Sequence, residues 1–339
     1  MIDRISLDKL ELFGLEEDPR MCESLIEKEH LRAERDPLAQ QLLESCYWEA
    51  DREQAFRRYL NSRDFSTTLE LLRLFNIPAD QPLAEIGGGS GFLSWALAQH
   101  DFQSVCLLEP NSHRTTGTGY LRTRQDAAGV TIENSLDAWY ASPDRFQTVI
   151  TRNCVHHFKN IAWIAACIRQ KVAPGGYWVM IREPFVDTSR DLYRFMHMHP
   201  YSQRYGIFEF AFPTLHFVDA LELATGFQLR AVVPEGYSNN CLSLYSEEAG
   251  SKRNAIFTRV VQWALRHVPR ATTACYRIQS MINRLFPGRK YFARPQVMLF
   301  QRKEVGEIAG SDIWYPLAED QSPAPERMLE PSAESICAA

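Results

Sequence analysis

The most informative segment of this chain reads Leu83-Ala84-Glu85-Ile86-Gly87-Gly88-Gly89-Ser90-Gly91-Phe92-Leu93, and it is followed by the helical run Trp95-Ala96-Leu97-Ala98. It predicts a buried strand that turns through a glycine loop into a helix. Glycine lets a backbone bend sharply and approach a ligand closely, and the start of a helix offers unpaired N–H donors and a positive dipole end. The segment therefore predicts a site for a carboxylate or a phosphate.

The glycine spacing distinguishes between two nucleotide ligands. A dinucleotide loop reads GxGxxG, whereas this loop has Phe92 at the last of those positions and reads Glu85-x-Gly87-x-Gly89-x-Gly91. That pattern resembles the first motif of the class I methyltransferases and favours S-adenosyl-L-methionine over NAD. A second predicted strand ends in Glu109, where a carboxylate can accept both ribose hydroxyls and would exclude a 2′-phosphate.

Further blocks extend the resemblance from about Leu83 to Pro184. They stand in the order and at the separations typical of the small-molecule type of class I S-adenosylmethionine-dependent methyltransferase. The chain is therefore similar to that family over this range. The blocks are Asp144-Arg145-Phe146-x-x-Val149, Asn153-Cys154-Val155-His156-His157-Phe158, Val172-Ala173-Pro174-Gly175-Gly176 and Glu183-Pro184.

The resemblance implies a cofactor, S-adenosyl-L-methionine, and a set of residues that bind it; no metal site is predicted. The glycine loop and Glu85 would hold the methionine end, Glu109 the ribose, and Asn153 the region near the reacting methyl group. Asn134 stands where the family usually has an Asp at the adenine amine, and its amide oxygen could accept the same hydrogen bond. The implied cofactor-binding residues are Glu85, Gly87, Gly88, Gly89, Gly91, Phe92, Glu109, Asn134 and Asn153.

Short β-rich runs alternate with helical stretches after Pro78, which predicts an α/β fold. Together with the resemblance, this favours a Rossmann-like, doubly wound sheet of seven mostly parallel strands, with an N-terminal helical cap and a helical insertion before the last strand. The expected strands lie near Pro82–Ile86, Ser104–Glu109, Val130–Glu133, Thr148–Asn153, Tyr177–Arg182, Phe227–Val233 and Gln296–Arg302.

Four regions are expected along the chain. Residues 1–78 form the helical cap, residues 79–236 and 296–303 the cofactor-binding core, and residues 237–295 a basic helical insertion. The insertion should contain one helix around Ile256–Val268 and a second over Ala271–Leu285. Residues 304–339 form an acidic tail, rich in Pro, Glu, Ser and Ala, whose end we expect to be disordered.

Transfer of a methyl group to a hydroxyl requires a base, because the proton must leave as the new bond forms. The doublet His156-His157 follows the fourth strand, and His is suited to this role near neutral pH. In related O-methyltransferases one such His is the base and a carboxylate after the fifth strand assists it. We favour His156, with Glu183 and Asp187 as the matching acids; alternatively, the doublet only shapes the pocket.

Composition limits the class of protein. Apolar residues make up 45% and charged residues 23% of the 339 residues, as in ordinary globular proteins, and no apolar run is long enough to span a membrane. The N-terminus carries no secretory signal, so we expect a cytoplasmic location. The eight cysteines form no CxxC pair and are expected to be reduced and structural.

The insertion is the basic part of a chain whose net charge is −5, because residues 251–303 contain no Asp or Glu. Residues 252–290 could contact an anionic surface, including a membrane as a peripheral contact, or they could be a solvated hairpin over the active site. A nucleic-acid partner is disfavoured by a pI near 6.0. The sequence does not indicate the oligomeric state.

The leading hypothesis is a biosynthetic O-methyltransferase acting on a sugar, a glycan or a secondary metabolite. N- or C-methylation of a small molecule is the alternative within the same chemistry. A non-catalytic, methyltransferase-like scaffold is the alternative from another class, and the intact glycine loop and Glu109 argue against it.

Overall fold

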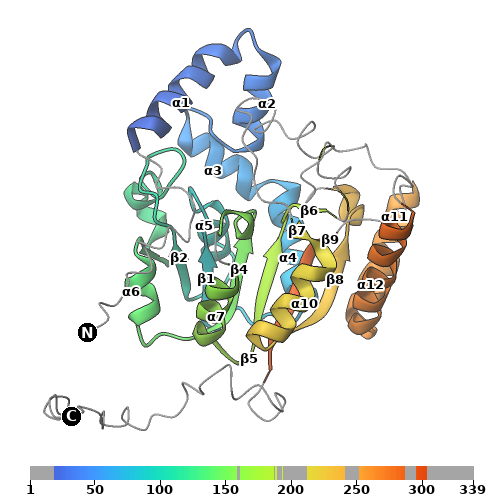
Figure 1. Ribbon diagram of the computed structural model, residues 1–339. Helices are drawn as coiled ribbons and strands as arrows, with labels where there is room; N and C mark the ends of the chain where they lie inside the picture. The colour runs from blue at the N-terminus through green and yellow to red at the C-terminus, as the bar shows by residue number, and fades with distance from the viewer. Residues whose placement is uncertain are drawn as a thin grey trace, which may run out of the picture.

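The computed structural model describes residues 19–158, 161–186, 188, 193, 212–240, 252–286 and 295–303. Its centre is a seven-stranded sheet with the strand order β3-β2-β1-β4-β5-β9-β8 (Figure 1). All seven predicted strands are present. They are β1 (Leu83–Ile86), β2 (Val105–Leu108), β3 (Val130–Glu133), β4 (Phe146–Arg152), β5 (Val172–Ile181), β8 (Phe227–Pro234) and β9 (Pro295–Arg302).

The sheet is parallel except at β9. Strands β1 to β5 pair in parallel, so that their carboxyl ends meet at one edge; Ile86 at the end of β1 lies beside Thr151 of β4. The last strand, β9, inserts between β5 and β8 and runs antiparallel to both. The expected doubly wound, mostly parallel α/β fold is therefore confirmed.

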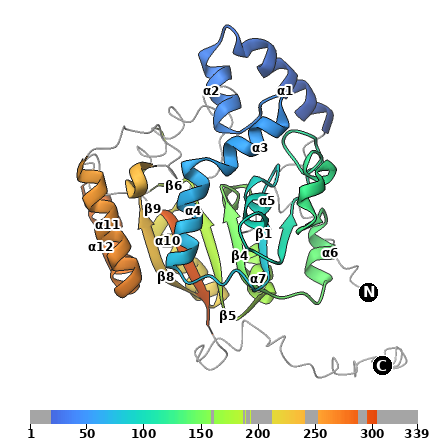
Figure 2. The same ribbon diagram turned by 180° about the vertical axis from the view of Figure 1, so that it is seen from behind.

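Helices cover both faces of the sheet. Successive strand residues point to opposite sides, so each face has its own apolar core. Ile150 belongs to the apolar core on one face and its neighbour Val149 to the core on the other. Figures 1 and 2 show the two helical layers. On the Ile150 side lie α3 (Arg52–Leu60), α4 (Arg63–Leu74), α5 (Phe92–Ala98) and α11 (Lys252–His267), and on the Val149 side lie α6 (Leu136–Ala141), α7 (Ile161–Lys171), α10 (Thr214–Thr225) and α12 (Pro269–Leu285).

The N-terminal helices divide into two pairs. Helices α1 (Pro19–Ala33) and α2 (Pro37–Ser45) stand away from the sheet at the top of Figure 1. Helices α3 and α4 instead contribute to the core of the sheet: the ring centroids of Phe56 and Phe92 lie 4.4 Å apart, and those of Tyr59 and Phe92 lie 5.6 Å apart. Both helices thus pack against α5, the helix that follows the glycine loop.

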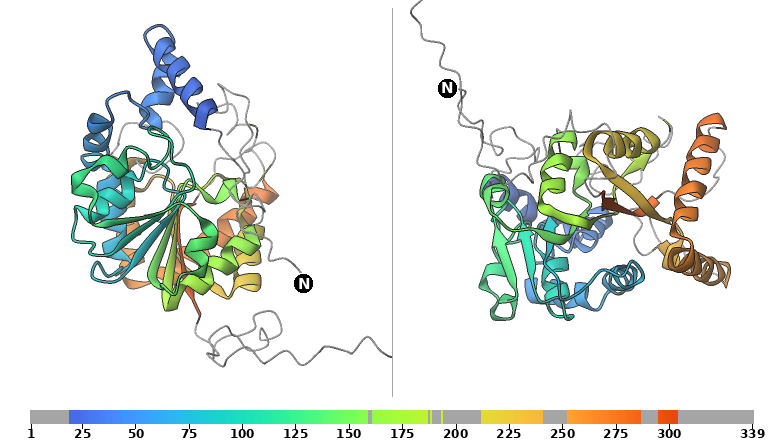
Figure 3. Two further views of the ribbon diagram at one scale, coloured as in Figure 1. Left: turned by 90° about the vertical axis from the view of Figure 1, so that its left-hand side faces the viewer. Right: turned by 90° about the horizontal axis from the view of Figure 1, so that it is seen from below.

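Several predicted boundaries differ from the observed ones, by five residues at most. Strand β5 begins at Val172 rather than Tyr177, because Gly175 adopts a left-handed φ of 71° and lets the strand continue through an irregular segment. Helix α12 begins at Pro269 rather than Ala271, since proline is well suited to the first helical position. Figure 3 shows α11 and α12 at one side of the molecule, beyond the edge strand β8.

A second, parallel sheet joins β6 (Phe185–Val186) to β7 (Phe212–Pro213) and was not predicted, since two-residue strands leave no periodic pattern. Single 3₁₀ turns also occur, at η2 (Leu121–Thr123), η3 (Gln125–Ala127), η4 (Val155–His157) and η5 (Tyr237–Asn240). The predicted acidic tail lies outside the described residues. Within them, no helix combines the length and the apolar character needed to cross a membrane.

Candidate active site

The glycine loop joins β1 to α5 in the shape that the sequence predicts. Gly87, Gly89 and Gly91 all have left-handed φ values, of 68°, 54° and 77°. A Cβ atom on Gly87 would lie 2.0 Å from the Sγ of Cys154, and one on Gly91 would lie 2.5 Å from a methyl carbon of Leu121. The loop is therefore pressed against the end of β4 on one side and against η2 on the other, and only glycine fits at these two positions.

Glu85 lies beneath this loop rather than at its surface. Its side chain is buried, and its Oε2 atom accepts hydrogen bonds from the backbone N–H of Ser94, at 2.9 Å, and from the Ser94 hydroxyl. The carboxylate thus caps the first turn of α5, whose N-cap, Gly91, has no side chain to do so. Burial raises the pKa of Glu85, against the opposing effect of the Ser94 hydrogen bonds.

The side chain of Phe92 does not face the predicted ligand site. Its ring is buried among Tyr47, Phe56 and Tyr59, so the side chain belongs to the core. Its backbone, at the first position of α5, is the part that lies at the loop.

Glu109 connects the glycine loop to the segment that follows β2. Its Oε2 accepts from the backbone N–H of Gly89 at 2.8 Å, and its Oε1 accepts from the backbone N–H of Asn111 at 2.8 Å. These two backbone contacts fix the carboxylate where the glycine loop meets the segment after β2. Glu109 therefore stands within the loop region where the sequence predicts the ribose site.

Asn134 lies beside Glu109, at the end of β3. Its amide nitrogen donates to the backbone oxygen of Glu109 at 2.5 Å, and its amide oxygen accepts from Arg122. The oxygen that we expected to face an adenine amine therefore already has a donor. Asn153 follows β4 and has a left-handed φ of 51°; its backbone N–H donates to the oxygen of Ile181 at 2.8 Å.

The predicted His156–Glu183 pair forms at the carboxyl ends of β4 and β5. The Nδ1 atom of His156 lies 2.9 Å from an Oε2 atom of Glu183, and both side chains are fully buried. Glu183 also accepts hydrogen bonds from three successive backbone N–H groups, those of Cys154, Val155 and His156. One buried carboxylate thus fixes both the η4 turn and the orientation of the imidazole.

The two histidines of the doublet have different environments. His156 is 1% exposed, whereas His157 is half-buried, and their ring centroids lie 4.1 Å apart. Because the His156 ring, including its Nε2 atom, has no exposed surface, an acceptor can reach it only if the residues that cover this atom move aside. The other predicted acid, Asp187, lies outside the described residues.

Sequence reasoning missed one arginine at the loop. Arg52, near the start of α3, donates from Nη2 to the Ser90 hydroxyl at 3.1 Å and from Nη1 to the backbone oxygen of Tyr47. Its guanidinium lies 5.2 Å from the centre of the Phe92 ring, and burial lowers its pKa to about 10. Nothing in the local sequence around Arg52 signals this contact, because its partner is 38 residues away.

A cluster of charged side chains, also not predicted from the sequence, links the carboxyl ends of β4 and β5 to α4. Asp64 accepts from Arg152 at the end of β4 and, at 3.0 Å, from Arg182 just after β5. The pKa of Arg152 is raised, because Asp64 together with Tyr59 and Tyr47 outweighs the opposing effect of burial. The pKa of Arg182 is lowered, mainly by burial and then by the neighbouring charge of Arg152. Two guanidinium groups thus share one largely buried carboxylate beside the predicted site.

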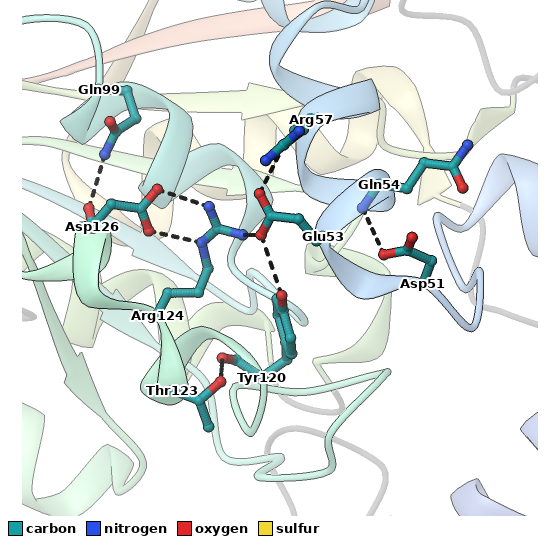
Figure 4. A network of polar contacts seen from close by, with 9 residues as sticks. All are labelled: Asp51, Glu53, Gln54, Arg57, Gln99, Tyr120, Thr123, Arg124 and Asp126. Atoms are coloured by element: carbon teal, nitrogen blue, oxygen red, sulfur yellow. Dashed lines mark hydrogen bonds and ion pairs between the residues drawn. The ribbon is translucent and has the colours of Figure 1, made fainter.

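Figure 4 shows how α3 is fastened to the segment after β2. Arg124 forms ion pairs with Glu53 and with Asp126, the latter at 2.7 Å, and Tyr120 donates to Glu53 at 3.2 Å. The Arg124 guanidinium also lies over the Trp95 ring, 4.4 Å from its centre. This network joins α3, α5 and the η2–η3 segment.

These contacts fit S-adenosyl-L-methionine. A loop of left-handed glycines, with no room for a Cβ at Gly87 or Gly91, lies at the N-terminus of a helix, and the Glu109 carboxylate lies beside it. Residues 51–232 match the sequence profile of a methyltransferase domain, which is more than half of the chain. This chain belongs to that family. It is an S-adenosylmethionine-dependent methyltransferase.

Solved structures include similar chains, all at low identity. The glycopeptide N-methyltransferase MtfA in complex with S-adenosyl-L-homocysteine is 18% identical, and the match covers 36% of this chain and 54% of that one, with a TM-score of 0.31. An S-adenosylmethionine-dependent methyltransferase from Mesorhizobium loti is 14% identical over 72% of this chain and 100% of that one, with a TM-score of 0.42. Magnesium protoporphyrin IX methyltransferase from Synechocystis, with S-adenosyl-L-homocysteine bound, is 11% identical over 71% and 81%, with a TM-score of 0.40.

This chain thus spans about half of the length of MtfA. A search of curated proteins finds no match to the sequence.

Proposed function

We propose that this methyltransferase transfers the methyl group to a hydroxyl of a small molecule or glycan, such as a sugar or a secondary metabolite. The observation that carries the proposal is the buried hydrogen bond between His156 and Glu183 at the ends of β4 and β5. A carboxylate that holds one ring nitrogen of a histidine orients the ring for proton transfer at the other. A hydroxyl acceptor has to lose its proton as the new bond forms, and a base in this position would take it.

The chain's own residues have separate tasks in this reaction. The glycine loop and Glu109 bind the cofactor, which supplies a methyl group on a sulfonium that is already a good leaving group. Glu85 and Arg52 hold the loop in shape from below and from α3. His156, oriented by Glu183, accepts the proton of the hydroxyl, and the buried surroundings exclude water from the transfer.

The first experiment measures cofactor binding without any acceptor. We expect S-adenosyl-L-homocysteine to raise the Tm of the full chain, since a ligand that binds the native state stabilises it by mass action. Glu109→Ala should abolish this shift, whereas Glu133→Ala, a control at the end of the neighbouring strand β3, should preserve it. No shift in the wild-type protein would contradict the cofactor site described here.

The second experiment tests the base. Methyl transfer from labelled S-adenosyl-L-methionine is screened against hydroxylated sugars, glycans and phenols, and the variants are then compared on the best acceptor. His156→Ala should keep the affinity for S-adenosyl-L-homocysteine and lose turnover by about 10²- to 10⁴-fold, the usual contribution of a general base.

His157→Asn is the matched comparison, because His157 belongs to the same turn and is half-buried, whereas the side chain that meets Glu183 at 2.9 Å is that of His156. Loss of turnover in His157→Asn alone would move the base to His157. Unchanged turnover in both variants would exclude a base from this doublet and favour an acceptor that needs none, such as an amine that reacts in its neutral form.

A further inference from the structure

The segment 252–286, here called the hairpin, comprises α11, α12 and the link between them, and it carries most of the exposed apolar surface of the described residues. Thirteen large apolar side chains are exposed in the described part of the chain, and nine of them lie in the hairpin. Single exposed apolar residues are normal on a protein surface, but a concentration on one element marks an interaction site. The nine residues are Ile256, Phe257, Val260, Trp263, Val268, Ile278, Met281, Leu285 and Phe286.

These side chains form helical stripes that face away from the protein. Ile256, Val260 and Trp263 follow one another at intervals of four and three residues on α11, while Val261 and Leu265 of the same helix are buried in the core. Helix α11 is therefore apolar on two sides. A helix that needed only to cover the sheet would have a polar outer face.

Helix α12 repeats the arrangement. Ile278, Met281 and Leu285 lie at intervals of three and four residues and are exposed, whereas Tyr276 is buried on the Val149 side of the sheet. Figures 1 and 2 show both helices beyond the edge strand β8, on the side of the molecule away from β3.

The charge of the hairpin is entirely positive. Its sequence holds no Asp or Glu, and its arginines lie beside the apolar stripes: Arg259 and Arg266 are each three residues after a stripe residue of α11, and Arg284 is three residues after Met281. Arg277 is different, because it points inward and forms ion pairs with Asp219 and Glu222 of α10, at 3.0 and 2.6 Å. No acidic side chain forms an ion pair with Arg259, Arg266 or Arg270 among the described residues.

An apolar stripe flanked by arginines is suited to one kind of surface. Trp, Phe and Leu side chains enter the boundary between lipid headgroups and acyl chains, while arginines beside them bind anionic headgroups. Long arginine side chains can bury their stems in this boundary and keep their charge at the headgroups. We propose that the hairpin binds the methyltransferase peripherally to the surface of an anionic membrane.

The test uses the full chain and vesicle sedimentation. We expect the protein to bind vesicles of phosphatidylcholine with phosphatidylserine, to bind phosphatidylcholine vesicles much less, and to dissociate as the salt concentration rises. Arg259→Gln combined with Arg266→Gln should weaken binding about 25-fold, because each cation near an anionic membrane contributes about fivefold. Trp263→Ser combined with Ile278→Ser should abolish it.

Matched controls come from exposed residues elsewhere. Trp163→Ser removes an exposed tryptophan of α7, and Arg73→Gln removes an exposed arginine of α4; both should leave vesicle binding unchanged. The Tm shift with S-adenosyl-L-homocysteine shows that each variant is folded. Because neither this shift nor vesicle binding requires a methyl acceptor, the test is independent of the proposed function.

Two outcomes would overturn the proposal. One is the absence of binding to anionic vesicles by the wild-type protein, which would indicate that the hairpin has another occupant, such as the acidic segment 304–339 or an RNA. The other is a dimer in light scattering that becomes a monomer in the Trp263→Ser and Ile278→Ser variant while vesicle binding stays the same, which would assign the surface to a second copy.

Discussion

At the scale of single residues, the cofactor loop depends on the absence of side-chain atoms. We expect Gly87→Ala to lose affinity for S-adenosyl-L-homocysteine by at least about tenfold and to destabilise the protein by about 2 kcal/mol. The added Cβ would overlap the Sγ of Cys154, and a left-handed φ costs a non-glycine residue about 1–2 kcal/mol. Calorimetric titration and urea unfolding measure the two effects.

Gly129→Ala is the control for this change, because a Cβ there would make only ordinary contact, at 3.4 Å, with Ala98. The combination of Gly87→Ala with Cys154→Ala should recover part of the affinity, since it removes the overlapping sulfur. If Gly87→Ala and Gly129→Ala behaved alike, the loop would be able to accommodate a Cβ atom at position 87, which contradicts the structure.

The buried carboxylate of Glu85 gives the stability a pH dependence. Its pKa is raised by burial above the ordinary value of 4.5, so its favourable contribution is fully present below about pH 4.5 and is lost as the pH rises through the raised value. Glu85→Gln removes this titration but keeps an acceptor for Ser94. The Tm of the variant relative to wild type should therefore increase from acidic to neutral pH, and a constant difference would contradict the shift.

At the scale of secondary-structure elements, Asp64 fastens α4 to the ends of β4 and β5. Asp64→Asn should destabilise the protein by about 3–5 kcal/mol, because it leaves two largely buried guanidinium groups without their carboxylate. Urea unfolding measures the loss. Asp51→Asn, which removes the charge of an exposed residue but keeps a good N-cap for α3, should change stability by less than about 0.5 kcal/mol.

Arg124 fastens α3 to the segment after β2 through the network in Figure 4. Arg124→Ala removes the partner of Glu53 and Asp126 and the cation over Trp95, so the amides of α3 should exchange with deuterium faster than in wild type. The amides of α10, on the other face of the sheet, serve as the internal control. Equal acceleration in α3 and α10 would indicate global destabilisation instead of local release of α3.

Elements were more predictable from the sequence than side-chain contacts. The strand Val130–Glu133 and the glycine loop were located from local patterns, since alternation and glycine spacing are written in adjacent residues. Asp64, by contrast, meets Arg152 across 88 residues, and Arg52 meets Ser90 across 38. Such pairs have no periodic signature. The Glu183–His156 hydrogen bond was expected only because the sequence resembles a family.

At the scale of the whole molecule, the sharing of one core by α3, α4 and the sheet has a thermodynamic consequence. Phe56, Tyr59 and Phe65 belong to the same apolar cluster as Leu107 and Val179. We therefore expect a single calorimetric transition for this part of the chain, which S-adenosyl-L-homocysteine moves as one. Two transitions, only one of them sensitive to the ligand, would instead support residues 1–78 as an independent cap.

The place of β9 has a consequence for synthesis on the ribosome. The chain emerges from its N-terminus, yet residues 295–302 form the strand that joins β8 to β5. Until they leave the exit tunnel, β8 has no neighbour in the sheet, and the edge of β5 stays open to pairing with other chains. The nascent enzyme therefore completes its sheet only after both helices of the hairpin have been made. A premature stop just after α12 would consequently yield an aggregation-prone product.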